Sequence, residues 1–180
     1  MKIKRFNFKK VSSTNNTAIR IIDKSKIDYG MVVSENQING KGQYGRNWIS
    51  YKGNLFVSIF YNIDNINFSI KKFTKINCLL VKELIFKFCK KEIFLKSPND
   101  LLINKKKVCG ILQETILKDN KRFLIVGIGI NLIKSPNIKK YPTTNLLEIL
   151  NKKIDYKIMV NELKLIFERK ISKFLKMKTQ

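Results

Sequence analysis

The segments DLLINKKKVCGILQETI (residues 100–116) and RFLIVGIGINLI (residues 122–133) decide the fold of this chain. Both are rich in Ile, Leu and Val, and the first is divided by an Asn-Lys turn, so together they predict three neighbouring strands. Residues 54–63 (NLFVSIFYNI) have a strong β pattern, and residues 29–37 and 93–97 predict two further strands. Because strands adjacent in sequence tend to pair as hairpins, we predict an α+β fold with a mixed, largely antiparallel sheet.

Helical patterns flank these strands. The hydroxyl and amide side chains of residues 12–15 are typical of a helix N-cap, and apolar residues follow them. Residues 68–90 carry apolar side chains at every third or fourth position, which predicts an amphipathic helix. Residues 144–150 predict a short helix, and residues 157–180 show helical spacing again. A length of 180 residues suits one domain, residues 1–180.

The charge and hydropathy of the chain limit the classes of partner that it can bind. The chain carries 37 Lys and Arg against 13 Asp and Glu, a formal net charge of +24. Its lysines are scattered rather than clustered with aromatic residues, so we disfavour a nucleic-acid-binding module and keep it as an alternative. A positive field that steers an acidic protein partner is a further interpretation. With no apolar run near the roughly 20 residues of a membrane span and no secretory signal, we expect a cytoplasmic protein without membrane or DNA partners.

Cysteine and histidine content narrows the chemistry. The three cysteines, Cys78, Cys89 and Cys109, are odd in number and form no C-x-x-C motif, which argues against a disulfide framework and fits a reducing compartment. The chain has no His, which excludes Ser-His-Asp and Cys-His catalysis and most zinc sites. Catalysis must therefore use Lys, Arg, Asp, Glu, backbone amides or a hard metal ion held by oxygen.

A glycine-rich segment, GKGQYG at residues 40–45, matches the spacing of a dinucleotide-binding turn. Such a turn needs a helix directly after it, and the following RNWISYKGNLFVSIF has β-branched and aromatic residues without helical spacing. The Walker pattern fails because Arg46 and Asn47 stand where Lys and Ser or Thr are required. The glycines and the cations Lys41 and Arg46 suit a loop that binds an anionic group, although a plain surface hairpin remains the alternative.

Four motifs occur in a fixed order: STN at residues 13–15, ENQINGKGQYGRNW at 35–48, KSPNDLLINKKKVCGILQE at 96–114 and GIGIN at 127–131. Together they resemble the catalytic domain of biotin protein ligases, also called biotin–[acetyl-CoA-carboxylase] ligases. The resemblance implies the catalytic-domain fold of biotin and lipoyl protein ligases, which is similar to class II synthetases. It also implies a catalytic domain alone, without an N-terminal helix-turn-helix domain and with the C-terminal β domain absent or vestigial.

The resemblance implies an ATP-dependent ligase. Biotin and ATP would form biotinyl-5′-AMP with Mg²⁺, and biotin would pass to a lysine of the biotin carboxyl carrier protein of acetyl-CoA carboxylase. A homodimer paired through sheet edges is possible within the family. The alternatives are a lipoate or octanoate ligase, whose R-R-x-S-G-G-G-type segment is absent here, and a degenerate ligase that binds biotin without turnover.

The resemblance also assigns residues. Binding of biotin falls to Ser13, Thr14, Asn15, Gln37, Gly40, Lys41, Gly42, Gln43, Lys107, Gly110, Leu112 and Gly127. Binding of ATP falls to Arg46, Lys96, Asn99, Asp100 and Asn131. Lys107, Arg46 and Asp100 would be catalytic, with Asp100 near Mg²⁺. Gly127 and Gly129 would let their strand approach the ligand, and Trp48 would pack under the loop rather than touch ligand.

Three positions in two motifs depart from the family pattern. The usual G-R-G-R has Lys41 and Gln43 in place of its arginines, and Ser97 replaces the Trp of K-W-P-N-D. Arginines at these positions help the family retain the adenylate, so the loss of a bidentate guanidinium predicts a leakier intermediate here.

Overall fold

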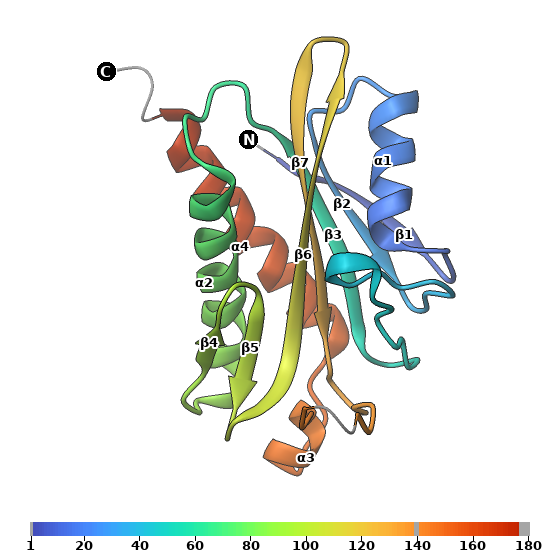
Figure 1. Ribbon diagram of the computed structural model, residues 1–180, viewed down its shortest axis with the longest axis vertical. Helices are drawn as coiled ribbons and strands as arrows, with labels where there is room; N and C mark the ends of the chain where they lie inside the picture. Colours follow the sequence, from blue (N-terminus) through green and yellow to red (C-terminus); the bar gives the residue numbers. More distant parts are fainter. Residues whose placement is uncertain (1, 139–140, 177–180) are drawn as a thin grey trace.

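A seven-stranded sheet forms the centre of the molecule (Figure 1). The structure, a computed structural model, describes residues 2–138 and 141–176. The strand order is β1-β2-β3-β7-β6-β5-β4, and every neighbouring pair is antiparallel except β1 and β2. The strands are β1 (Lys4–Phe8), β2 (Tyr29–Ser34), β3 (Leu55–Asn62), β4 (Phe94–Lys96), β5 (Asp100–Ile103), β6 (Lys106–Lys118) and β7 (Lys121–Ile130).

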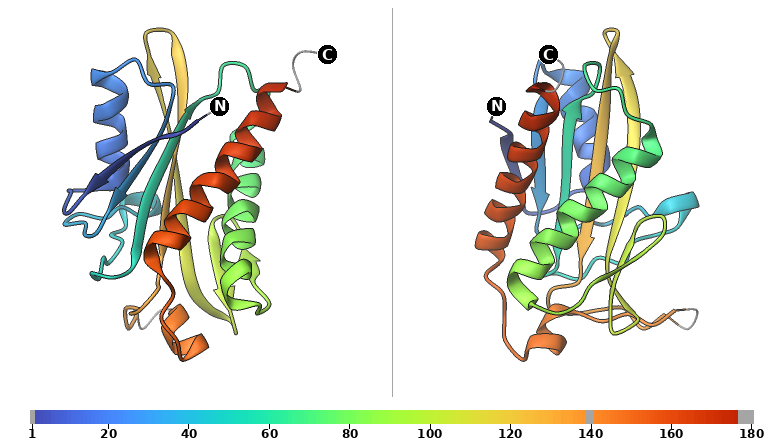
Figure 2. Two further views of the ribbon diagram at one scale, coloured as in Figure 1. Left: turned by 180° about the vertical axis from the view of Figure 1, so that it is seen from behind. Right: turned by 90° about the vertical axis from the view of Figure 1, so that its left-hand side faces the viewer.

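Helices cover both faces of this sheet (Figure 2). Helix α1 (Thr14–Lys24) lies on one face, and the two long helices α2 (Ile70–Cys89) and α4 (Tyr156–Lys176) lie on the other. A short helix α3 (Leu146–Leu150) precedes α4, and a single 3₁₀ turn η1 (Gln43–Gly45) lies in the glycine-rich segment. No helix in the described ranges is long and apolar enough to cross a membrane.

Alternation along the strands produces two separate hydrophobic cores. In β7, Leu124 and Val126 face the larger core beneath α2 and α4, whereas Phe123 and Ile125 face the smaller core beneath α1. The positions that continue the α1-facing row are Gly127 and Gly129. The apolar filling under α1 therefore ends within β7, and the space beyond it is available for a binding site.

The predicted fold class is confirmed, and the predicted helices appear with small changes of boundary. The structure begins the long amphipathic helix at Ile70, with the Ser69 side chain accepting a hydrogen bond from the Lys72 N–H as its N-cap. At α1 the N-cap residue is Ser13, but its side chain makes no capping bond. The last predicted helix is α4, and residues 177–180 of that prediction lie outside the described residues.

Strand β1 was not predicted, because its sequence KRFNF is short and strongly charged. It pairs in parallel with β2, from Lys4 opposite Gly30 to Phe8 opposite Ser34. Partners distant in sequence therefore create this strand, and local pattern alone does not reveal it.

Candidate functional site

The floor of the site is the α1-facing surface of β3, β7 and β6, where one serine and three glycines lie close together. Ser58 of β3 pairs with Gly127 of β7, which in turn pairs with Leu112 of β6. In the next row toward the end of the sheet, Gly129 pairs with Gly110. The sheet therefore presents largely bare backbone at this point.

Two side chains lie directly on these glycines. A Cβ at Gly110 or Gly129 would lie 2.7 or 2.6 Å from the Trp48 ring, closer than real Cβ contacts allow. A Cβ at Gly127 would overlap the Asn15 amide oxygen. The glycines of β6 and β7 thus make room for the protein's own Trp48 and Asn15. Gly127 and Gly129, which we expected to let their strand approach a ligand, also line the cavity. Trp48 packs on the sheet, and it lines the cavity as well.

Around this floor lies a cavity of about 280 Å³. Its walls are the N-terminal end of α1, the glycine loop (residues 40–48), the turn between β4 and β5, and Tyr141. The lining residues that the sequence also predicted are Ser13, Thr14, Asn15, Gln37, Lys41, Gly42, Gln43, Arg46, Lys96, Asn99, Asp100, Lys107, Gly110, Leu112 and Gly127. Segments far apart in sequence therefore converge on one space.

Amide and hydroxyl groups form one end of the cavity. The backbone N–H and the hydroxyl of Thr14 both donate to Gln37 Oε1, at 2.8 and 3.0 Å, and Gln37 Nε2 donates to Ser50 Oγ at 3.2 Å. Asn15 is 2% exposed and is held between two further polar side chains of the sheet. This end, the polar end (Ser13, Thr14, Asn15 and Gln37), suits a neutral ligand group with several donors and acceptors.

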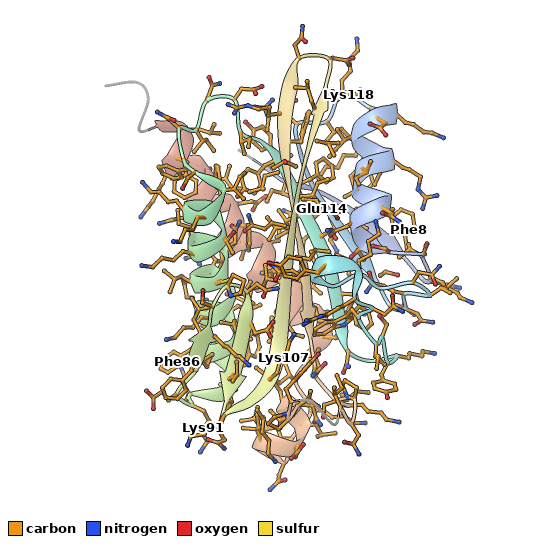
Figure 3. The ribbon with its side chains drawn as sticks, in the orientation of Figure 1. Phe8, Phe86, Lys91, Lys107, Glu114 and Lys118 are labelled. Atoms are coloured by element: carbon orange, nitrogen blue, oxygen red, sulfur yellow. The ribbon has the colours of Figure 1, made fainter. Side chains whose placement is uncertain are left out.

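The opposite end is charged. Lys107 Nζ lies 2.8 Å from Asp100 Oδ1, and both side chains are mostly buried. The same ammonium lies 5.4 Å from the centre of the Trp48 ring and 5.5 Å from that of Tyr141, within the range of cation–π attraction. The backbone of Lys107 is fixed as well, because its N–H donates to the Pro142 carbonyl oxygen at 2.9 Å. Lys107 is thus an ordered cation within the cavity (Figure 3).

The glycine loop is an ordered turn and not an open strand connection. The Trp48 N–H donates to the Gly40 carbonyl oxygen at 2.8 Å, and the Gly42 N–H donates to the Arg46 carbonyl oxygen at 2.7 Å. Tyr44 at its tip has φ 55° and is 89% exposed. Gly40 itself does not line the cavity: it is buried, and a Cβ there would lie 2.6 Å from the Trp48 carbonyl oxygen.

A second cavity of about 30 Å³ adjoins the charged end. It is lined by Trp48, Lys107, Tyr141 and by Asn131, which the sequence assigned to the main site. Within the described ranges, Trp48 Nε1 and Asn131 Oδ1 are buried and have no hydrogen-bond partner. The Asn131 Nδ2 group donates to the Thr144 carbonyl oxygen at 3.1 Å, which leaves its oxygen free. One donor and one acceptor therefore remain for a bound group.

Asn99 and the cysteines have clear local roles. Asn99 Nδ2 donates to the Ile111 carbonyl oxygen at 2.7 Å, which fixes the turn before β5 against β6. The three cysteines are buried and free. Burial raises the pKa of the Cys78 thiol to about 11, with the Asp100 charge adding to the effect, and burial raises the pKa of Cys109 well above its ordinary value. Neither thiol is a nucleophile at neutral pH.

The described residues that line the cavity do not supply enough carboxylate ligands to form a magnesium site by themselves. Asp100 is the only carboxylate among the described residues that line the cavity, and it is paired with Lys107. The described ranges also hold no cluster of three His, Cys, Asp or Glu side chains. We therefore assign no step to a metal ion.

Sequence reasoning missed Tyr141, and it did not foresee that Trp48 packs on the glycines of β6 and β7. The signal for Trp48 was the set of alternating glycines in β6 and β7, because bare backbone inside a protein must be covered by a large side chain. No local signal exists for Tyr141, which lies in an irregular segment and approaches Lys107 only through tertiary contacts.

Known proteins show the same architecture. The chain is 29% identical to the biotin protein ligase from Aquifex aeolicus solved with biotin and ATP, with a TM-score of 0.81 over 96% of this chain and 72% of that one. It is 22% identical to a Leishmania major ligase solved with biotinyl-5-AMP, with a TM-score of 0.79 over 91% of this chain and 72% of that one, a likeness of fold.

Curated relatives agree. The Bacillus subtilis bifunctional ligase/repressor BirA is 30% identical over 173 residues, which are 92% of this chain and 53% of that protein. This chain thus spans about half the length of such relatives. Residues 8–131 match the Biotin/lipoate A/B protein ligase family, and the chain belongs to that family.

Proposed function

We propose that this protein activates biotin with ATP to form biotinyl-5′-AMP and then transfers biotin to a lysine of a biotin carboxyl carrier protein. The observation that carries the proposal is the position of Lys107. Its ammonium lies in the main cavity that also holds the polar end, and it lines the small cavity with the free Trp48 donor and Asn131 acceptor. A cation there can meet two anionic reactants at once.

The chemistry requires such a cation. In the first step a biotin carboxylate oxygen attacks the α-phosphorus of ATP, and pyrophosphate leaves with the electron pair of the broken P–O bond. Lys107 would exchange Asp100 for the carboxylate and α-phosphate, and so offset their repulsion and the charge that develops at phosphorus. In the second step the carrier lysine amine attacks the acyl carbon, and AMP leaves. Asp100, released from Lys107, would be placed to accept the amine proton.

The small cavity has room for about two water molecules and not for a whole base, but its two unpartnered groups support contact with the edge of a purine. Adenine offers an exocyclic amine as donor next to a ring nitrogen as acceptor, which complements Asn131 Oδ1 and Trp48 Nε1. We assign biotin's ureido ring to the polar end, because a site that hydrogen-bonds a buried polar group rejects analogues that lack it.

Biotin-dependent exchange of pyrophosphate with ATP tests the activation step, and transfer to a purified carrier domain tests the second. We expect Lys107→Met to reduce exchange at least a hundredfold, about the loss for removing one charge-stabilising donor. Lys105→Met, in the exposed turn before β6, is the matched control and should keep full exchange. Exchange driven by lipoate or octanoate but not by biotin would replace the proposal with a lipoyl ligase.

The partner proposal follows from charge. With a net charge of +24, an acidic carrier domain would be steered toward this protein, and the rate of transfer should fall as salt increases. We place the reaction in the cytoplasm, and the three free thiols support a reducing compartment.

A further inference from the structure

Glu114 lies just outside the cavity, and the proposed function so far assigns it no role. It lies on β6 in the same alternating row as Gly110 and Leu112, and it pairs across the sheet with Ile125. Figure 3 shows it on this strand between Lys107 and Lys118, at the level of α1. Its carboxylate is half-buried and does not line the cavity. A charged side chain at this boundary calls for a specific partner.

That partner is the side-chain amide of Asn15. Asn15 Nδ2 donates to Glu114 Oε2 at 2.6 Å, and on its other side Asn15 Oδ1 accepts a hydrogen bond from the Ser58 hydroxyl. Because Gly127 has no side chain, the amide can lie flat on the sheet between these two groups. The first turn of α1 contains no acidic residue, so Glu114 also supplies the negative charge that favours a helix N-terminus.

The Glu114 contact fixes which way the amide points. A carboxylate only accepts hydrogen bonds, so it holds the Asn15 nitrogen, and the Ser58 hydroxyl then donates to the oxygen. A flipped amide would set its oxygen against the carboxylate and lose that bond, whereas the Ser58 hydroxyl can donate or accept and would bond either atom. Asn15 therefore presents its remaining N–H and its remaining lone pair to the cavity in one arrangement.

We propose that Glu114 is a positioning residue that fixes the orientation of the Asn15 amide, which Ser58 anchors from its other side, and so sets the selectivity of the polar end for a ureido ring. This proposal rests on the proposed function for the identity of the ligand. The orientation of the amide is independent of it, and the two are therefore tested by separate measurements.

The first measurement observes the amide directly. At 21.1 kDa the protein is suited to ¹⁵N NMR, and the Asn15 side-chain NH₂ pair can be assigned by its loss in Asn15→Asp. In the ligand-free protein we expect two well-separated, exchange-protected resonances. Glu114→Leu, which is similar in size and cannot accept, should broaden them and speed their exchange. Unchanged resonances in Glu114→Leu would overturn the proposal.

The second measurement is biotin affinity by calorimetry. We expect Glu114→Leu to raise the Kd for biotin about tenfold, the size of one lost hydrogen bond, and to leave the KM for ATP and the kcat of exchange within twofold. Glu114→Gln keeps an acceptor without enforcing the orientation, so about threefold is expected. Ser58→Ala acts on the same amide from another strand, and its effect should be less than additive with that of Glu114→Leu.

Lys118→Met provides the matched control for a purely structural role. Lys118 is on the same strand and anchors the other end of α1, with Nζ donating to the carbonyl oxygens of Ile22 at 2.6 Å and Ser25 at 3.2 Å. The Lys118→Met substitution should lower the melting temperature and leave the Kd for biotin unchanged. If Lys118→Met raised the biotin Kd as much as Glu114→Leu, Glu114 would merely hold the helix. If the wild type bound no biotin while its amide responded to Glu114→Leu, the proposed function would fail and the orientation would stand.

Discussion

At the scale of single residues, Gln43 is the departure from the family pattern with the clearest consequence, because the family has an arginine at this position. It begins the turn η1 and lines the cavity, and the loop backbone around it is fixed, since the Arg46 N–H donates to the Gln43 carbonyl oxygen at 3.2 Å. The neutral amide of Gln43 makes weaker hydrogen bonds to phosphate than a planar, charged guanidinium. We therefore predict that residue 43 influences how firmly the loop holds an anionic intermediate.

Replacing Gln43 by the arginine of the family pattern tests how residue 43 affects retention of the intermediate. We expect Gln43→Arg to slow the release of biotinyl-5′-AMP about tenfold, because a charge-assisted bidentate contact replaces a neutral one. The measurement is the off-rate of the purified adenylate, followed by stopped-flow fluorescence of Trp48. Lys105→Arg, which changes a cation outside the cavity, is the control. Equal off-rates in Gln43→Arg and the wild type would contradict the prediction.

How much of the site the sequence predicted also depends on particular residues. Thr14, Gln37 and Lys107 were identified through the resemblance of their motifs to those of biotin protein ligases, and they line one cavity. Without that resemblance Lys107 could not be told from its neighbours Lys105 and Lys106. Asn131 was assigned to the same space, but β7 ends at Ile130, and the chain then turns so that Asn131 contacts Thr144 in a neighbouring cavity. Such a turn depends on tertiary contacts that no local pattern encodes.

At the scale of elements, β1 shows how a marginal strand is held. Beyond its parallel pairing with β2, the chain just before it is tied to α4, because the Ile3 N–H donates to Glu168 Oε1 at 2.6 Å. Lys164, one turn earlier in α4, lies 2.9 Å from the same oxygen. A charged and short strand is thus held at the edge of the sheet by a helix from the other end of the chain, which explains why its sequence alone did not predict it.

This tie makes stability depend on pH. Burial acts to raise the pKa of Glu168, but the Ile3 N–H and the Lys164 ammonium outweigh it and hold the pKa below its ordinary value of 4.5. A lowered folded pKa contributes stability that is present above the ordinary value and is lost as pH falls through the folded one. Glu168→Gln should therefore lower the free energy of unfolding at pH 7, and the difference from the wild type should shrink below pH 4 in urea titrations. A difference that stayed constant with pH would show that Glu168 acts through packing alone.

At the scale of the whole molecule, the sheet separates two tasks. Its α2 and α4 face carries the large core, whereas its α1 face carries a smaller core that gives way to the cavity. Cys109 alternates with Gly110 on β6, so its thiol is on the core side directly behind the cavity floor. Cys78 of α2 is close enough to contribute to the raised pKa of Cys109, after the larger effect of burial. These thiols therefore report on whether the supporting face opens.

Thiol labelling uses this arrangement. Because the thiols are buried and the pKa of Cys78 is about 11, we expect a thiol reagent at pH 8 to react with the native protein only through unfolding, with all three cysteines labelled at one slow rate. Saturating biotin with ATP should slow labelling in proportion to ligand concentration over Kd, since ligand binds only the folded state. Octanoate with ATP is the control and should slow labelling only as much as ATP alone does. Rapid labelling of Cys109 alone, with Cys78 and Cys89 still protected, would show instead that β6 separates locally from the helices and that the floor of the cavity is not rigidly supported.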